Sequence, residues 1–214
     1  GEDEKAEAAM VEARKADPKD INLLLNHANL YLKLDKKDDF KRLMEEAIAA
    51  DPNNAGLHFN VGVINQEQGN KDLARASYNK AIELKPKLAP SYVNRGFAYI
   101  RKGLQDHAIS DYNKAIVLDP GISQAYNNRG LAYYKKGQYG QAISDYNKAI
   151  KLDPRYAKAY INRGLAYDKR GEYDKAISDF TTVIKIDPRN ADAYFCRGNA
   201  YDNKGEYDQA ISDF

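Results

Sequence analysis

The sequence predicts an all-α solenoid built from stacked antiparallel helix–turn–helix units, and three observations predict it. Prolines recur at a fixed spacing of thirty-four residues, a period that is typical of solenoids. Between successive prolines, apolar residues recur twice at helical steps of three and four. A glycine separates the two runs in most units, where it can end a helix. The periodic prolines are Pro18, Pro52, Pro86, Pro120, Pro154 and Pro188.

The repeat frame divides the chain into a partial first piece, five full units and a truncated last unit. The first piece fits the second half of a unit, so we expect a single helix there. The period continues without a slip, so we expect one array with no linker. The pieces, in order, are 1–20, 21–54, 55–88, 89–122, 123–156, 157–190 and 191–214.

The unit 123–156 shows how each element is predicted. Tyr126 and Tyr133 mark the apolar face of its first helix, since seven residues make two helical turns. Gly137 follows and can adopt the left-handed conformation that ends a helix. A second apolar run then continues to the residue before Pro154, which is pushed out of helical conformation. Each unit is therefore expected to be a helical hairpin.

A second glycine recurs in the middle of the first helix, where glycine costs about 1 kcal/mol relative to alanine. A cost repeated in unit after unit indicates that the partner helix approaches closely there. We expect alanines of the second helix to supply the matching small surface. The glycines are Gly62, Gly96, Gly130, Gly164 and Gly198, and the alanines are Ala74, Ala108, Ala142, Ala176 and Ala210.

An arginine occupies one place of the first helix in the later units, whereas the first two full units have His27 and Val61 there. We expect the arginine stem to pack while its head reaches a carboxylate or a carbonyl at a helix end. A role facing a ligand is the alternative. The arginines are Arg95, Arg129, Arg163 and Arg197.

Composition excludes several classes of function. Charged residues make up 30% of the 214 residues, yet the net charge is only +2 and the two signs alternate, so we expect no nucleic-acid partner. No apolar run is long enough for membrane insertion. The single cysteine, Cys196, excludes an internal disulfide. No signal peptide is visible at residue 1, which favours the cytoplasm while leaving the compartment open.

These places together resemble the tetratricopeptide repeat, and the resemblance covers essentially the whole chain, as in a multi-repeat fragment of a larger protein of that family. The places that carry it in one unit are Tyr126, Arg129, Gly130, Tyr133, Ala142, Tyr146, Ala149 and Pro154. The resemblance implies a right-handed superhelix whose first helices line a concave groove. It also implies protein binding, often of an extended peptide, rather than catalysis.

The residue patterns indicate no enzyme, no metal site and no cofactor. His27, His58 and His107 occupy three different places, and none lies at ligand spacing from another histidine or a cysteine. The aspartates and serines that could serve in catalysis follow the repeat, whereas catalytic carboxylates need unequal environments. Fifteen of the seventeen tyrosines fall in four places of the unit, which indicates packing between helices.

The groove is where the sequence places function. One place of the first helix is asparagine in five successive units, and a carboxamide can pair with both polar groups of a peptide backbone. Superhelices of glycosyltransferases that act on proteins look like this; local hydrogen bonding is the alternative. The asparagines are Asn26, Asn60, Asn94, Asn128 and Asn162. The neighbouring residues expected to bind ligand side chains are Phe59, Val93, Phe97, Asn127, Leu131, Tyr134, Ile161, Leu165 and Phe195.

The carboxylate clamp for heat-shock chaperones is the best-known ligand mode of the family that this chain resembles. In units 21 to 122, the clamp places hold Leu25, Asn29, Asn60, Pro90 and Asn94, so only two of the five match. The basic side chains that make the clamp electrostatic are missing. We therefore expect a different ligand.

The sequence thus predicts a protein-interaction scaffold that binds an extended, partly apolar peptide. Two alternatives stay open. The first is self-association through repeat ends or grooves, because the sequence begins and ends inside repeats. The second is a targeting module of a larger enzyme.

Overall fold

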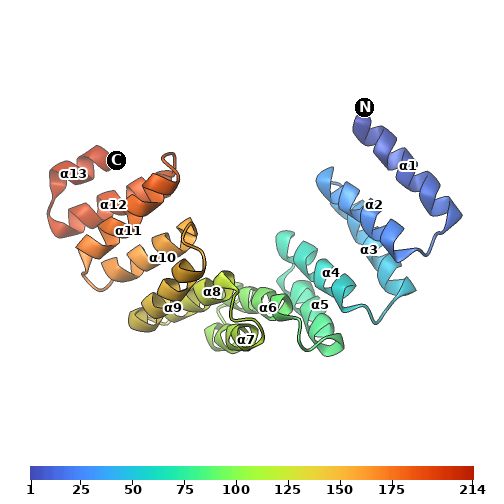
Figure 1. Cartoon of the computed structure of the whole chain (residues 1–214), viewed down its shortest axis with the longest axis horizontal. Coiled ribbons are helices and arrows are strands. Elements are labelled where there is room, and N and C mark those ends of the chain that lie inside the picture. Colours follow the sequence, from blue (N-terminus) through green and yellow to red (C-terminus); the bar gives the residue numbers. More distant parts are fainter. The chain divides into compact units, whose positions relative to one another are not determined.

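The structure, a computed structural model, describes residues 1–214 and contains thirteen helices and no strand (Figure 1). The predicted class, an all-α solenoid of helix–turn–helix repeats, is confirmed. The helices are α1 (Glu2–Ala16), α2 (Ile21–Lys33), α3 (Lys37–Ala50), α4 (Ala55–Glu67), α5 (Lys71–Leu84), α6 (Ala89–Arg101), α7 (Gln105–Leu118), α8 (Ser123–Lys135), α9 (Tyr139–Leu152), α10 (Ala157–Asp168), α11 (Tyr173–Ile186), α12 (Ala191–Lys204) and α13 (Tyr207–Asp213).

The turn inside each hairpin is built on a residue with positive φ. Gly137 ends the first helix of its hairpin at φ 73°, a conformation that glycine adopts without steric cost. Gly69, Gly103, Gly171 and Gly205 take a similar conformation in four other hairpin turns. The first hairpin differs, because Asp35 holds φ 55° there. That conformation is unfavourable for a residue with a Cβ atom, so the first turn is the strained one.

The chain forms two compact units, Gly1–Ala98 and Tyr99–Phe214, and α6 passes from one to the other. In the first unit, successive helices from α1 to α5 pack against their neighbours in chain order. Its main core cluster mixes aliphatic side chains with the rings of Tyr31 and Phe40 and closes around buried residues of α2, α3 and α4. The largest fully buried members of this cluster are Leu24, Leu43, Met44 and Leu57.

In the second unit, helices α7 to α13 also pack in chain order, but the first helices of successive hairpins meet as well. Helix α8 contacts α10 and α10 contacts α12, whereas successive second helices α9 and α11 make no such contact. The first helices of this unit therefore lie closer together than its second helices. The side of the unit on which α8, α10 and α12 meet is called its inner side. The cores between the layers close around fully buried aromatic rings, Tyr112, Tyr146 and Phe180.

The glycine in the middle of the first helix is needed because a ring lies directly against it. A Cβ atom on Gly130 would come within 2.7 Å of Cε1 of Tyr146 on the partner helix. Gly164 meets Phe180 in the same way at 2.6 Å. The predicted close approach is thus present, but the nearest atoms belong to this aromatic ring rather than to the alanine that we expected to face the glycine.

Candidate functional site

The asparagine face of each unit, taken by itself, consists of its repeated asparagines: Asn26, Asn60 and Asn94 lie on α2, α4 and α6 in the first unit, and Asn128 and Asn162 lie on α8 and α10 in the second. Asn26 and Asn60 are exposed, and the other three are half-buried. In the second unit, Asn128 and Asn162 belong to the helices that meet on the inner side. All five amides are therefore at or near the surface, where a ligand could reach them. The first helix of the next hairpin, α12, has Cys196 at the place of the repeated asparagine. Burial raises the pKa of the Cys196 thiol.

A buried third amide joins Asn128 and Asn162. Asn127 is 1% exposed, although the equivalent residues in the other units are apolar. Its Oδ1 accepts a hydrogen bond of 2.9 Å from Nδ2 of Asn162, and its own Nδ2 donates to Oδ1 of Asn128 at 3.2 Å. The network spans α8 and α10 and leaves both amino hydrogens of Asn128 and the Oδ1 of Asn162 without a protein partner.

Two of the residues that we predicted to contact ligand side chains are not surface residues. Val93 is 5% exposed and Asn127 is 1% exposed, because each packs inside its repeat layer. The half-buried members keep part of their surface free: Phe59, Phe97, Leu131, Tyr134, Ile161 and Leu165. Phe195 on α12 is the exception in the other direction, at 60% exposed. Fewer of the predicted side chains are therefore available to a ligand than the sequence indicated.

A tyrosine hydroxyl beneath one asparagine accounts for part of the pattern. In the first unit, burial raises the pKa of Tyr78, and a hydrogen bond with Asn94 opposes that rise. The Tyr78 hydroxyl also donates to Oε1 of Gln66 at 3.4 Å. The equivalent hydroxyls of Tyr112 and Tyr146 are buried and have no partner. Local hydrogen bonding therefore engages Asn94, Asn128 and Asn162, whereas it does not explain Asn26 and Asn60.

A hollow of about 270 Å³ opens where this tyrosine–asparagine pair is replaced. Phe180 occupies the place of Tyr78, Tyr112 and Tyr146 in the three preceding units, and Cys196 occupies the place of the repeated asparagine. Both changes remove polar atoms, and Cys196 is also the shorter side chain. The hollow is lined by Leu165, Asp168, Lys169, Phe180, Cys196, Asn199, Asp202 and Asn203.

The repeated arginine has a structural role. Arg163 donates two hydrogen bonds to Asp179 of its own hairpin, from Nε at 2.8 Å and from Nη2 at 2.6 Å. Its Nη1 donates to Asn147 of the preceding hairpin at 2.6 Å. Arg129 and Arg197 repeat the paired geometry with Asp145 and Asp213. A fork of this kind ties three helices together, which confirms the carboxylate contact that we expected.

The arginine and the aspartate change together along the chain. Where the arginine is absent, the aspartate is absent too: the first two full units have His27 with Leu43 and Val61 with Ser77. His27 is 1% exposed, its ring nitrogens have no partner, and burial lowers its pKa. These two hairpins are therefore held by apolar packing instead of by an ion pair.

The basic residues near the ends of the first helices are paired within the protein. Lys136 bonds to Asp106 of the preceding hairpin, and Lys204 lies 2.7 Å from Asp174 in the same arrangement. Arg170 lies 2.8 Å from Glu172. Lys136 and Lys204 therefore link neighbouring hairpins, and Arg170 pairs within its own hairpin, so these three basic residues have a structural role.

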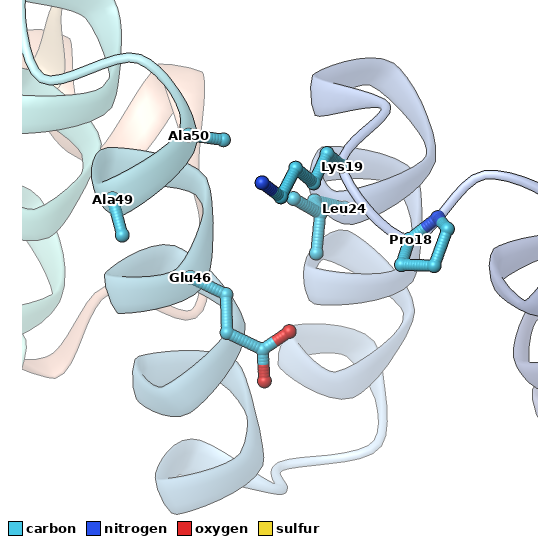
Figure 2. Close-up of a pocket in the computed structure, with 6 residues that line it drawn as sticks. All are labelled: Pro18, Lys19, Leu24, Glu46, Ala49 and Ala50. Carbon is cyan, nitrogen blue, oxygen red and sulfur yellow. The ribbon is translucent and has the colours of Figure 1, made fainter.

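A further hollow lies in the first unit, and none of the repeated asparagines lines it. Its volume is about 460 Å³, and it lies between the link from α1 to α2 and the end of α3. Figure 2 shows Lys19 and Glu46 at its edges and small side chains along α3. It lacks a convergent set of polar groups, so it does not have the lining expected of a ligand site. The residues that line it are Pro18, Lys19, Leu24, Glu46, Ala49 and Ala50.

No group of three or more His, Cys, Asp or Glu side chains gathers where it could hold a metal ion. Nor does any of the thirteen helices combine the length and the apolar character that crossing a membrane requires. Fold and surface together define a helical repeat scaffold for protein–protein interaction.

Comparison with known proteins assigns that scaffold to a family. Models described as TPR repeat match residues 67–103, 98–137 and 131–171, and models described as tetratricopeptide repeat match residues 21–54, 157–190 and 180–212. The chain belongs to the tetratricopeptide repeat family. None of the curated proteins matches it.

Among solved structures, the chain is similar to the MamA protein, with 33% identity and a TM-score of 0.66 over 75% of this chain and 87% of that one. It is also similar in fold to PilW, a type IV pilus biogenesis factor, with 21% identity and a TM-score of 0.84 over 90% of each chain. YrrB, described as a TPR protein with an unusual peptide-binding site, shares 19% identity and a TM-score of 0.66 over 86% of this chain and 95% of that one.

Proposed function

We propose that this scaffold binds an extended, partly apolar peptide along the inner side of the second unit. Asn128 and Asn162 hydrogen-bond its backbone, and Leu131, Ile161 and Leu165 contact its side chains. The observation that carries the proposal is the pair of half-buried amides, which keep unused hydrogen-bonding groups on the helices that meet on the inner side.

The chemistry of the two asparagines suits a peptide backbone. A carboxamide offers donors and acceptors in one plane, and so does each peptide unit of an extended chain. Recognition through the backbone tolerates many side chains, while the half-buried apolar residues favour a partly apolar ligand. The exposed Asn26 and Asn60 offer the same groups on the first unit, considered by itself. YrrB, with its peptide-binding site, supports the view that this fold can accommodate such a ligand.

The test is a peptide array probed with the chain and with the double variant Asn128→Ala, Asn162→Ala. We expect the double variant to lose about 10-fold or more in affinity for the array peptide that binds best, since each lost hydrogen bond costs about 0.5–1.5 kcal/mol. Asn113→Ala is the matched control, because it removes an amide that bonds Arg129 on α8 from α7. Unchanged affinity in the double variant, with a native circular dichroism spectrum, would reject the proposal.

A further inference from the structure

Asn127 is a polar residue at a place where every other unit has an apolar one. The equivalent residues are Leu25, Phe59, Val93, Ile161 and Phe195. Burying an amide costs free energy unless its groups are hydrogen-bonded, and Asn127 bonds only to Asn128 and Asn162. A buried amide that serves two half-exposed amides has no packing advantage over leucine or valine. Its effect must lie in what it does to its two neighbours.

Hydrogen bonding fixes how these neighbours present their groups. Asn162 donates one of its own amino hydrogens to Asn127, so the Oδ1 of Asn162 remains available as an acceptor. Asn128 accepts through its Oδ1, so its amino hydrogens remain available as donors. Rotating one amide alone would bring two oxygens or two amino groups together, so the three amides can reverse only in concert. In either sense, the two outer amides present unlike groups.

We propose that Asn127 is a positioning residue, which couples Asn128 and Asn162 so that one offers a donor and the other an acceptor to the bound backbone. This inference rests on the proposed function. An extended backbone displays N–H and C=O groups together along one edge, so one donor and one acceptor presented together match it. Without Asn127, each outer amide rotates independently and spends part of its time in the wrong orientation.

The first experiment needs no ligand. Hydrogen exchange of the side-chain amides of Asn128 and Asn162 is followed by NMR in the chain and in Asn127→Leu, a residue of similar size that one other unit has at this place. We expect slow exchange of the Asn162 amide in the unaltered chain, faster exchange in Asn127→Leu, and no change in Asn113→Ala. Equal exchange of the Asn162 amide in the chain and in Asn127→Leu would overturn the positioning role.

The second experiment uses the array peptide that binds best and a set of its esters, each with one backbone N–H replaced by oxygen. We expect Asn127→Leu to keep its unfolding midpoint and to lose about 3- to 10-fold in affinity, the effect of about one hydrogen bond. One ester should bind more weakly to the unaltered chain, and that penalty should disappear in Asn162→Ala and shrink in Asn127→Leu.

The outcomes separate the two proposals. If Asn127→Leu binds every peptide as the chain does while the double variant of Asn128 and Asn162 does not, the positioning role is wrong and the peptide site stands. If the double variant also binds normally, the proposed function is wrong, and the exchange measurement alone decides whether Asn127 orders the two amides.

Discussion

The contact between Gly130 and Tyr146 allows a quantitative prediction. A Cβ atom added at Gly130 would lie 2.7 Å from Cε1, 2.9 Å from Cδ1 and 3.1 Å from Cζ of that ring. Ordinary contacts between carbon atoms are about 3.5–4.0 Å, so the ring would have to move. Tyr146 is fully buried, so its movement would displace the side chains around it. The substitution Gly130→Ala, the smallest that adds a Cβ atom, is therefore already overpacked.

The magnitude follows from two opposing effects. Overpacking in a filled core costs about 1–3 kcal/mol, and Gly130→Ala belongs near the upper end because three atoms of a buried ring are crowded. Alanine in a helix interior recovers about 1 kcal/mol relative to glycine. We therefore expect a net loss of about 1–2 kcal/mol in the stability of the hairpin formed by α8 and α9.

The assay must resolve one hairpin, because repeat arrays do not always unfold in a single step. Native-state hydrogen exchange at backbone amides of α8 and α9 reports that local stability directly. Gly140→Ala is the control in the same hairpin, since Gly140 lies in the first turn of α9 and a Cβ atom there meets nothing within 4 Å. We expect this control to be neutral or stabilising. If Gly130→Ala protects α8 and α9 as well as Gly140→Ala does, the close-approach argument is wrong.

Three further predictions concern the ion pairs, the first turn and the buried histidine. Asp179→Ala should lower the free energy of unfolding in urea by about 1–3 kcal/mol, because it leaves the largely buried Arg163 guanidinium without its carboxylate. The double variant Arg163→Val, Asp179→Ser should lower it less, because neither charge remains. A larger loss in the double variant would contradict an ion-pair role. Asp35→Gly should stabilise the α2–α3 hairpin by up to about 1 kcal/mol by removing backbone strain, with hydrogen exchange of α3 as the measurement and a loss of protection as the contrary result. His27 has its pKa lowered by burial, so the unfolded chain takes up the proton first, and the stability of α1 to α3 should fall as pH drops below about 6.5. His27→Leu should abolish that dependence in urea titrations, and an unchanged pH profile would rule out the histidine as its source.

The sequence was sufficient for the fold because its signals repeat. Pro154, Gly137 and the apolar steps each mark one helix end or one helix face, and their recurrence at a fixed period removes the ambiguity that a single occurrence would have. The role of Arg163 could also be predicted, since an arginine can pack its apolar side-chain carbons while its guanidinium binds a carboxylate.

Contacts that depend on distances across helices could not be predicted from the sequence. The ring of Tyr146, rather than Ala142, crowds Gly130, because helix rotation decides which side chain faces the glycine. Asn127 was expected to contact a ligand, yet it is buried beneath the amide pair that it serves. The sequence shows that the early units lack both the arginine and the aspartate, but it does not show that these two residues bond to each other. Val61 and Ser77 occupy the places at which Arg129 and Asp145 are hydrogen-bonded in a later unit, so the structure explains why both residues change together.

Asparagine recurs at one place inside the first helices of five successive units. Asparagine is less favourable in a helix interior than alanine or leucine, by roughly 0.5–0.7 kcal/mol, so its recurrence needs a compensating reason. Packing does not supply it at Asn26 and Asn60, which are exposed, and neither is among the residues with a side-chain bond. Local hydrogen bonding supplies it only in part at Asn94, Asn128 and Asn162. At two of its five places this residue is costly to the helix and has no role in the fold, which is the pattern expected if the proposed peptide ligand uses these amides.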